Sequence, residues 1–457
     1  MPEARHPDRD TLERFSRGAI SAEQAQWIED HLRSGCPVCQ RKVDDLLWQL
    51  QPAAPGQTPG ASGGNTEEDR IWSRLLARLE HRLALINRER DAAPGLVEEL
   101  LAAAPGEREA LLRCRRFQTI AVCELLIERS FAEGFQDPAR ARELADLAVQ
   151  AADRLDAVLY GRSVVQDFRA RAWAYLGNAR RLGSDLQGAE EAIALAERFS
   201  EEGSADPLEE ARILDLKASL LGDQGYLEQA AGLLDVVIDI YDDVRDVHRQ
   251  GRALISKGLF LAYAGQPEQG LDWICRGLDL VRGGQEPRLV LMANHNIAWC
   301  LADCGRAGEA QSHLDGIRHL YDGFSDPWTR LRLGWLEARI AMGLGRREEA
   351  ERKLHELRAA FVEQRLGYDA SIVTLDLAAL YLEQGRTQEV RRLAEEALPV
   401  LLAQDIHREA MAALIAFHRA TELEQATPGM VRQVAAYLFR ARKNPELRFE
   451  GWEPAGG

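Results

Sequence analysis

The stretch LLGDQGYLEQA, residues 220–230, decides the fold, because related stretches return along the chain at a fixed spacing. The related stretches are LAYAGQPEQG (261–270), LADCGRAGEA (301–310), AMGLGRREEA (341–350) and YLEQGRTQEV (381–390). Each contains a glycine, and the spacing between successive glycines is 40 residues, at Gly225, Gly265, Gly305, Gly345 and Gly385. A fixed period of about 20–50 residues is the signature of a repeat architecture.

Small residues recur on both sides of each glycine. Seven residues before it stand Ala218, Gly258, Ala298, Ala338 and Ala378, and five residues after it stand Ala230, Gly270, Ala310, Ala350 and Val390. Small side chains at fixed positions let the two helices of a hairpin approach closely, and glycine supplies the left-handed turn that ends the first helix. We therefore predict stacked helical hairpins, whose neighbours together bury a continuous apolar core.

The composition agrees with a helical protein. Apolar residues make up 46% of the 457 residues and charged residues 28%, which is typical of a globular chain. Alanine, leucine, glutamate and arginine dominate, whereas the β-branched residues that favour strands are scarce. The predicted fold class is all-α.

The repeat pattern resembles the tetratricopeptide repeat (TPR) family. The resemblance rests on the small residue of the first helix, the turn glycine and the alanine of the second helix. It covers roughly residues 135–405, including an earlier copy with Gly183 at the turn. A less regular copy is predicted over 123–155. Units of that family usually run about 34 residues. We attribute the extra residues of each 40-residue unit in this chain to longer helices or to longer links between hairpins. The resemblance implies a superhelix that binds a protein or peptide.

In TPR superhelices the first helix of each hairpin lines the concave face. Six residues before each small packing residue, the register then places Arg212, Arg252, Met292, Arg332 and Ile372 toward the groove. Arginines at one register in neighbouring turns can clamp the carboxylates of a partner. The predicted partner-binding groove consists of Arg212, Arg252, His295, Trp299, Arg332 and Trp335. The alternative is that these arginines are solvated or pair with acids of the preceding hairpin.

A separate His/Cys cluster lies in EDHLRSGCPVCQ, residues 29–40. Thiolate and imidazole are the ligands that zinc prefers, and a Cys-x2-Cys pair lets both sulfurs reach one tetrahedral ion. His31, Cys36 and Cys39 are therefore predicted Zn²⁺ ligands. His6 is the nearest upstream candidate for the fourth position, with Asp8 or a water as alternatives.

The segment around this cluster, residues 6–47, resembles the zinc-binding anti-sigma factor family. That family has an upstream His or Cys followed by His-x3-Cys-x2-Cys, and this chain has one extra residue between His31 and Cys36. The resemblance implies that His6, His31, Cys36 and Cys39 hold zinc and that the domain clamps a sigma factor. The alternative is a purely structural zinc knuckle without a sigma-factor role.

The cluster and the repeats suggest four regions. We predict a zinc-binding domain over 1–50, a flexible linker over 51–66, a TPR-like domain over 67–445 and a tail over 446–457. The linker assignment rests on QPAAPGQTPGASGG, residues 51–64, which is rich in Pro, Gly and Ser and carries no charge.

Several function classes are disfavoured. The net charge of −16 is unsuited to direct nucleic-acid binding, and no apolar run approaches the roughly 18 residues that a membrane helix needs. The charged start of the chain lacks a secretory signal, so we expect a cytoplasmic protein. No phosphate loop, nucleophile elbow or zinc-protease motif is found, so we expect no enzyme. The predicted function is a regulator in which the zinc domain controls a transcription partner and the repeats bind a protein or peptide; the alternative is an interaction scaffold.

Overall fold

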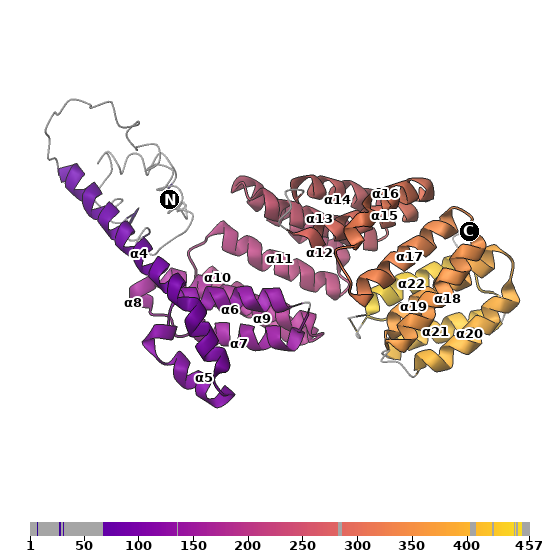
Figure 1. Ribbon diagram of the computed structural model, residues 1–457, viewed down its shortest axis with the longest axis horizontal. Coiled ribbons are helices and arrows are strands. Elements are labelled where there is room, and N and C mark those ends of the chain that lie inside the picture. The colour runs from indigo at the N-terminus through magenta and orange to yellow at the C-terminus, as the bar shows by residue number, and fades with distance from the viewer. Residues whose placement is uncertain are drawn as a thin grey trace, which may run out of the picture. The chain divides into compact units, whose positions relative to one another are not determined.

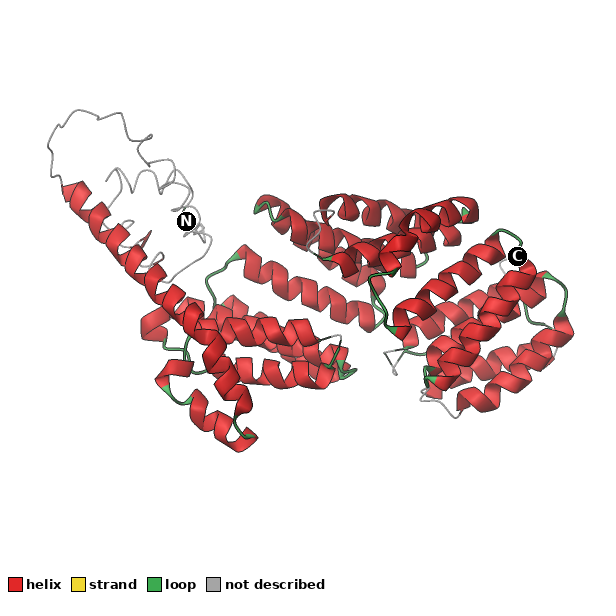
Figure 2. Ribbon diagram, viewed as in Figure 1, coloured by secondary structure: helices red, strands yellow, loops and turns green. Residues whose placement is uncertain are grey.

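The computed structural model describes residues 67–134, 136–281, 286–402, 408–422 and 425–442, together with Asn444, residues 447–449, Pro7, Trp27, Ile28 and His31. Every regular element in these residues is a helix, as Figure 2 shows, so the prediction of an all-α fold is confirmed. In the same residues, no helix combines the length and apolarity required to cross a bilayer. The chain divides into two compact units, residues 1–216 and 217–457.

The first unit contains the less regular hairpins. Its helices are α4 (Glu67–Ala102), α5 (Pro105–Leu112), the 3₁₀ helix η1 (Arg115–Phe117), α6 (Ile120–Glu133), α7 (Pro138–Ala152), α8 (Ala157–Tyr160), α9 (Arg162–Leu182) and α10 (Leu186–Glu201). Helices α6 and α7 pair with each other, as do α9 and α10. The apolar core shared by α6, α7 and α9 includes Leu126, Ala145 and Leu176.

The second unit contains the regular hairpins (Figure 1). Helix α11 (Pro207–Asp223) leads into it. It is followed by α12 (Leu227–Asp243), α13 (Val247–Tyr263), α14 (Pro267–Val281), α15 (Pro287–Asp303), α16 (Ala307–Tyr321), α17 (Pro327–Gly343), α18 (Arg347–Glu363), α19 (Gly367–Glu383), α20 (Thr387–Leu402), α21 (Arg408–Glu422) and α22 (Pro428–Ala441).

The predicted period is confirmed. The first helices begin at residues 207, 247, 287, 327 and 367, and the second helices begin at residues 227, 267, 307, 347 and 387. The extra residues relative to a usual TPR unit lie in the helices, because α11, α12 and α13 each have 17 residues. The links between them, 224–226 and 244–246, are short.

The turn glycines behave as predicted. Gly225, Gly265, Gly305, Gly345 and Gly385 all adopt the left-handed conformation, with φ between 70° and 87°. The earlier copy differs, because Gly183 has φ −82° and Ser184 has φ 64°. The amide of Asp185 bonds to the Arg180 carbonyl, as that of Tyr226 bonds to Leu221. Ser184 is thus the equivalent of Gly225, and the prediction of Gly183 at this position was wrong by one residue.

The small residues hold the paired helices close together. Between α13 and α14, a Cβ added to Gly258 would lie 2.6 Å from the Gly270 carbonyl oxygen, and the reverse distance is also 2.6 Å. In neighbouring hairpins the alanines at these two positions are fully buried, at Ala218, Ala230, Ala298, Ala310, Ala338 and Ala350. Backbone contact at this point therefore sets the separation of the two helices.

Replacing Gly258 with alanine should destabilise the protein, because the new methyl group meets backbone rather than a movable side chain. We expect Gly258→Ala to lower the free energy of unfolding by about 1–3 kcal/mol, as overpacking usually does. The measurement is urea unfolding followed by circular dichroism. Gly232, in the middle of α12, is the matched control, since an added Cβ there meets no atom within 4 Å. Gly232→Ala should raise stability by about 0.5–1 kcal/mol; equal effects of both variants would contradict the packing argument.

Candidate functional site

Three of the predicted zinc ligands, His6, Cys36 and Cys39, lie outside the described residues. The fourth, His31, is half-buried, and its ring centroid lies 5.8 Å from that of Trp27. Among the described residues, no group of three His, Cys, Asp or Glu side chains is arranged to hold a metal ion. The zinc site and the domain boundaries predicted for 1–66 therefore remain predictions.

The predicted groove residues of the second unit lie on α13, α15 and α17. Together with α19, these first helices of successive hairpins are here called the first-helix row. Helix α15 packs against both α13 and α17. The Trp335 indole on α17 reaches α19 by donating to Asp376. Side chains 40 residues apart in sequence therefore lie on neighbouring helices of one row.

The three arginines of the predicted groove have different environments. Arg212, in the first unit, donates to Glu209 at 2.6 Å. Arg252 on α13 donates to Glu286 at 3.1 Å, and Glu286 also contacts His248. These two arginines are thus already paired with acids of the array.

Arg332 on α17 is different. Its Nη2 lies 3.4 Å from Oδ1 of Asn296 on α15, and no carboxylate in the described part of the chain forms an ion pair with it. Burial raises the pKa of the Tyr263 hydroxyl on α13, and the charge and hydrogen bond of Arg332 oppose that rise. Arg332 therefore joins three helices of the row and forms no salt bridge in the described residues. Its charge nevertheless acts on the buried Asp369 of α19, because burial raises the pKa of that carboxyl and the charges of Arg442 and Arg332 oppose the rise.

Two polar atoms beside Arg332 are buried without a hydrogen-bond partner in the structure, Nε2 of His295 and Nδ2 of Asn296. The other ring nitrogen of His295 lies 2.8 Å from the Tyr321 hydroxyl. Burial, and secondarily the charge of Arg332, lowers the pKa of His295 well below its ordinary value. The imidazole is therefore neutral, and the Nδ2 amide of Asn296 is a buried hydrogen-bond donor beside Arg332.

The predicted tryptophans form an aromatic cluster. The rings of Trp299 and Trp335 meet edge to face with centroids 5.6 Å apart. The guanidinium of Arg339 lies 4.7 Å from the Trp299 ring and bonds to Asp303 at 2.6 Å. Trp335 is buried and donates to Asp376 at 2.8 Å, so it also holds α17 against α19.

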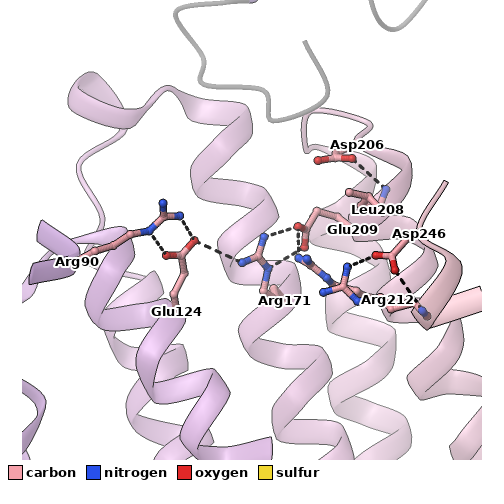
Figure 3. A network of polar contacts seen from close by, with 9 residues as sticks. Arg90, Glu124, Arg171, Asp206, Leu208, Glu209, Arg212 and Asp246 are labelled. Carbon is pink, nitrogen blue, oxygen red and sulfur yellow. Dashed lines mark hydrogen bonds and ion pairs between the residues drawn. The ribbon is translucent and has the colours of Figure 1, made fainter. Parts of the chain in front are cut away.

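The first unit also contains a network of charged side chains that the sequence did not reveal (Figure 3). Arg90 on α4 donates to Glu124 on α6 at 3.2 Å, and Arg171 on α9 lies 3.9 Å from the same carboxylate. Arg171 also makes a two-pronged contact with the buried Glu209, with one bond of 2.8 Å. Arg212 joins the same network through its ion pair with Glu209. Arg212 therefore belongs to a network that ties four helices together.

The comparisons with known proteins concern the fold. No protein-family model matches the chain, and no curated protein matches its sequence. The crystal structure of a Rap protein complexed with competence and sporulation factor is similar, with a TM-score of 0.51 and 13% identity over 71% of this chain and 87% of that chain. The fold is TPR-like.

Two further solved structures are similar at lower scores. Aspartyl phosphate phosphatase F from Bacillus subtilis has a TM-score of 0.49 and 13% identity, over 85% of this chain and 98% of that chain. A tetratricopeptide repeat protein from Parabacteroides merdae ATCC 43184 has a TM-score of 0.40 and 16% identity, over 66% of this chain and 98% of that chain. At these identities the likeness describes how the helices are arranged and nothing about ligands.

One ionisable group of the TPR-like array is placed to make stability depend on pH. Asp167 on α9 is buried and accepts a hydrogen bond from the Ser204 amide at 3.0 Å, which holds the loop between α10 and α11. Burial raises the pKa of Asp167 to about 7, the hydrogen bonds from Ser204 oppose the rise, and the charges of Glu209 and Asp206 add to it.

The raised pKa predicts a loss of stability as the pH increases. The folded protein keeps the Asp167 proton up to about pH 7, whereas an unfolded aspartate releases it near pH 4. Its stabilising contribution is thus complete below about pH 4 and lost as the pH rises through about 7. Asp167→Asn, which keeps an acceptor for Ser204, should flatten this dependence. Melting temperatures measured from pH 5 to pH 8 for both proteins test it; parallel curves would contradict the assignment.

Proposed function

We propose that the chain is a non-enzymatic cytoplasmic regulator with two binding modules. The TPR-like repeats bind a protein or peptide through the first-helix row. The N-terminal segment binds zinc through His6, His31, Cys36 and Cys39 and controls a transcription partner such as a sigma factor.

The observation that carries the first half of the proposal is the environment of Arg332. Arg212 and Arg252 pair with Glu209 and Glu286, whereas Arg332 has a neighbouring amide donor, Asn296 Nδ2, and no carboxylate partner in the described residues. A buried donor without an acceptor costs about 1–3 kcal/mol. A peptide carboxylate or carbonyl placed between Arg332 and Asn296 would accept from both, and charge-assisted bonds of this kind are among the strong ones.

The second half of the proposal rests on the ligand pattern of the sequence. A closed zinc site saturated by four protein ligands stabilises a fold and offers no open position for catalysis. Binding to the transcription partner would then depend on the surface of the small domain. The linker predicted over 51–66 would set the effective concentration of one module near the other.

Charge reversal at Arg332 tests the role of the repeats. In affinity purification from native extract, Arg332→Glu should reduce the recovery of the repeat partner at least tenfold, because it replaces a cation that forms no salt bridge in the described residues with an anion. The matched control is Arg352→Glu on α18, where the arginine is exposed and pairs with Glu356 one turn away. Equal recovery with Arg332→Glu, Arg352→Glu and the wild type would contradict a partner site on the first-helix row.

The same purification with Cys36→Ser/Cys39→Ser separates the two modules. We expect this variant to lose zinc, measured by elemental analysis, and to lose the transcription partner while retaining the partner of the repeats. Zinc loss with an unchanged set of bound proteins would leave a repeat scaffold with a structural zinc knuckle.

A further inference from the structure

Helices α15 and α17 of the first-helix row contact each other in a regular pattern. Three contacts join residues that are 36 positions apart in sequence: Asp303 with Arg339, Trp299 with Trp335, and Asn296 with Arg332. Because one offset recurs over two helical turns, the two helices lie side by side, run in the same direction and keep a fixed register. The next pair in this register can therefore be identified by counting.

The next pair is Met292 and Trp328, which are also 36 positions apart. It lies one turn from Asn296 and Arg332, a distance of about 6 Å along the helix axis. Met292 and Trp328 are 40% and 36% exposed. The ring of Trp328 meets that of Phe361 on α18 edge to face, with centroids 6.1 Å apart, so its orientation is held. An exposed apolar pair thus adjoins the polar pair of the candidate site.

An ion pair bounds this apolar surface on its other side. Arg288, one turn before Met292 on α15, donates to Asp326 at 2.7 Å. Asp326 is the N-cap residue of α17 and also accepts from the Thr329 amide at 2.9 Å, which fixes its carboxylate. The exposed apolar surface between this ion pair and Arg332 is therefore about one helical turn long, which suits a single large side chain.

The polar pair on the near side favours an acceptor. Asn296 is only 4% exposed, and its Nδ2 donor is buried without a hydrogen-bond partner among the described residues. Arg332 adds a cation that forms no salt bridge in the same part of the chain. Single exposed apolar side chains are common and need no explanation. Here, however, two of them adjoin a cation and an unsatisfied buried donor.

We propose that this surface binds a segment of a partner protein that presents two side chains at once. A carboxylate side chain lies between Arg332 and Asn296, and a large apolar side chain, about 6 Å away, covers Met292 and Trp328. The two side chains are four positions apart in a helical segment or two apart in an extended one, since both spacings place them on one side of the backbone. This inference rests on the proposed function and adds a second determinant of specificity.

The two halves of the surface make different contributions. An ion pair that stays exposed to water contributes little by itself, so the acid alone does not give a stable complex. The apolar side chain excludes water from the region beside Arg332 and contacts Trp328, whose ring is already held. Tryptophan and arginine are the residue types that most often dominate binding energy, and methionine adapts to the shape of an apolar ligand. Recognition therefore requires both side chains of the partner.

The first test selects peptides from a phage-displayed library of random sequences on the immobilised full-length protein. Fusion to the coat protein blocks the peptide C-terminus, so a selected carboxylate comes from a side chain. We expect Asp or Glu with Leu, Met, Phe or Trp two or four positions away. Arg332→Gln should lose the preference for the acid, and Trp328→Ala the preference for the apolar residue. Selection of peptides without this pair, or of no peptide, overturns the inference.

Fluorescence anisotropy with a selected peptide measures whether its apolar residue meets Trp328. We expect Trp328→Ala to weaken binding about tenfold, as loss of a tryptophan anchor commonly does. Serine in place of the peptide's apolar residue should weaken binding to the wild type by a similar factor. The same serine peptide should bind Trp328→Ala no more weakly than the original peptide does, because the contact is already lost. Losses that multiply would place the apolar residue elsewhere and overturn the inference.

A second variant covers the case in which Trp328→Ala does not fold, since Trp328 also contacts Phe361. Met292 is exposed, and glutamine keeps its length, so Met292→Gln should fold and weaken the peptide about threefold. The matched control is Val236→Gln on α12, where the valine is 45% exposed and binding should match the wild type. Equal binding by the two glutamine variants overturns the inference. The proposed function still stands in that case if Arg332→Glu loses its partner in the purification.

Discussion

The structure depends on the contact between two small residues where the helices of each hairpin cross. At Gly258 and Gly270 the backbones meet so closely that a methyl group would have no space, and alanines occupy the same positions in the neighbouring hairpins. Close approach at one fixed point sets the distance between the helices. The left-handed glycine that follows then sets where the second helix begins.

The candidate site is a consequence of this repetition. Because each hairpin begins 40 residues after the previous one, residues at one register fall on neighbouring helices of the first-helix row. Arg332 can thus meet Asn296 from the preceding hairpin, and Trp335 can meet Asp376 from the following one. The repeat imposes the spacing, while the residue types that differ between copies give the surface its chemistry.

The sequence was sufficient for the parts of the fold that repeat. The period, the turn glycines and the paired small residues follow from local rules, so each could be located without coordinates. It failed by one residue at Ser184, because a non-glycine residue occupies the left-handed position and only the hydrogen-bond pattern identifies it. Nothing in a single sequence marks such a substitution.

The site was only partly predictable. The register identified Arg332, but it could not show that Arg212 and Arg252 are paired whereas Arg332 is not. Those pairings depend on acids such as Glu286, 34 positions from Arg252, whose side-chain directions are set by packing. The contact of Arg442 with Asp369 spans 73 positions and crosses the repeat pattern, so no periodicity reveals it.

The central claim is that partners bind to the first helices of the hairpins rather than the second. The most direct test places the photo-crosslinking residue benzoylphenylalanine at Met292 on α15 or at Val236 on α12, two apolar side chains that are 40% and 45% exposed. Irradiation in native extract should give a discrete adduct from position 292 and none from position 236. An adduct from position 236 alone would contradict the account, because it would place the partner on the second helices.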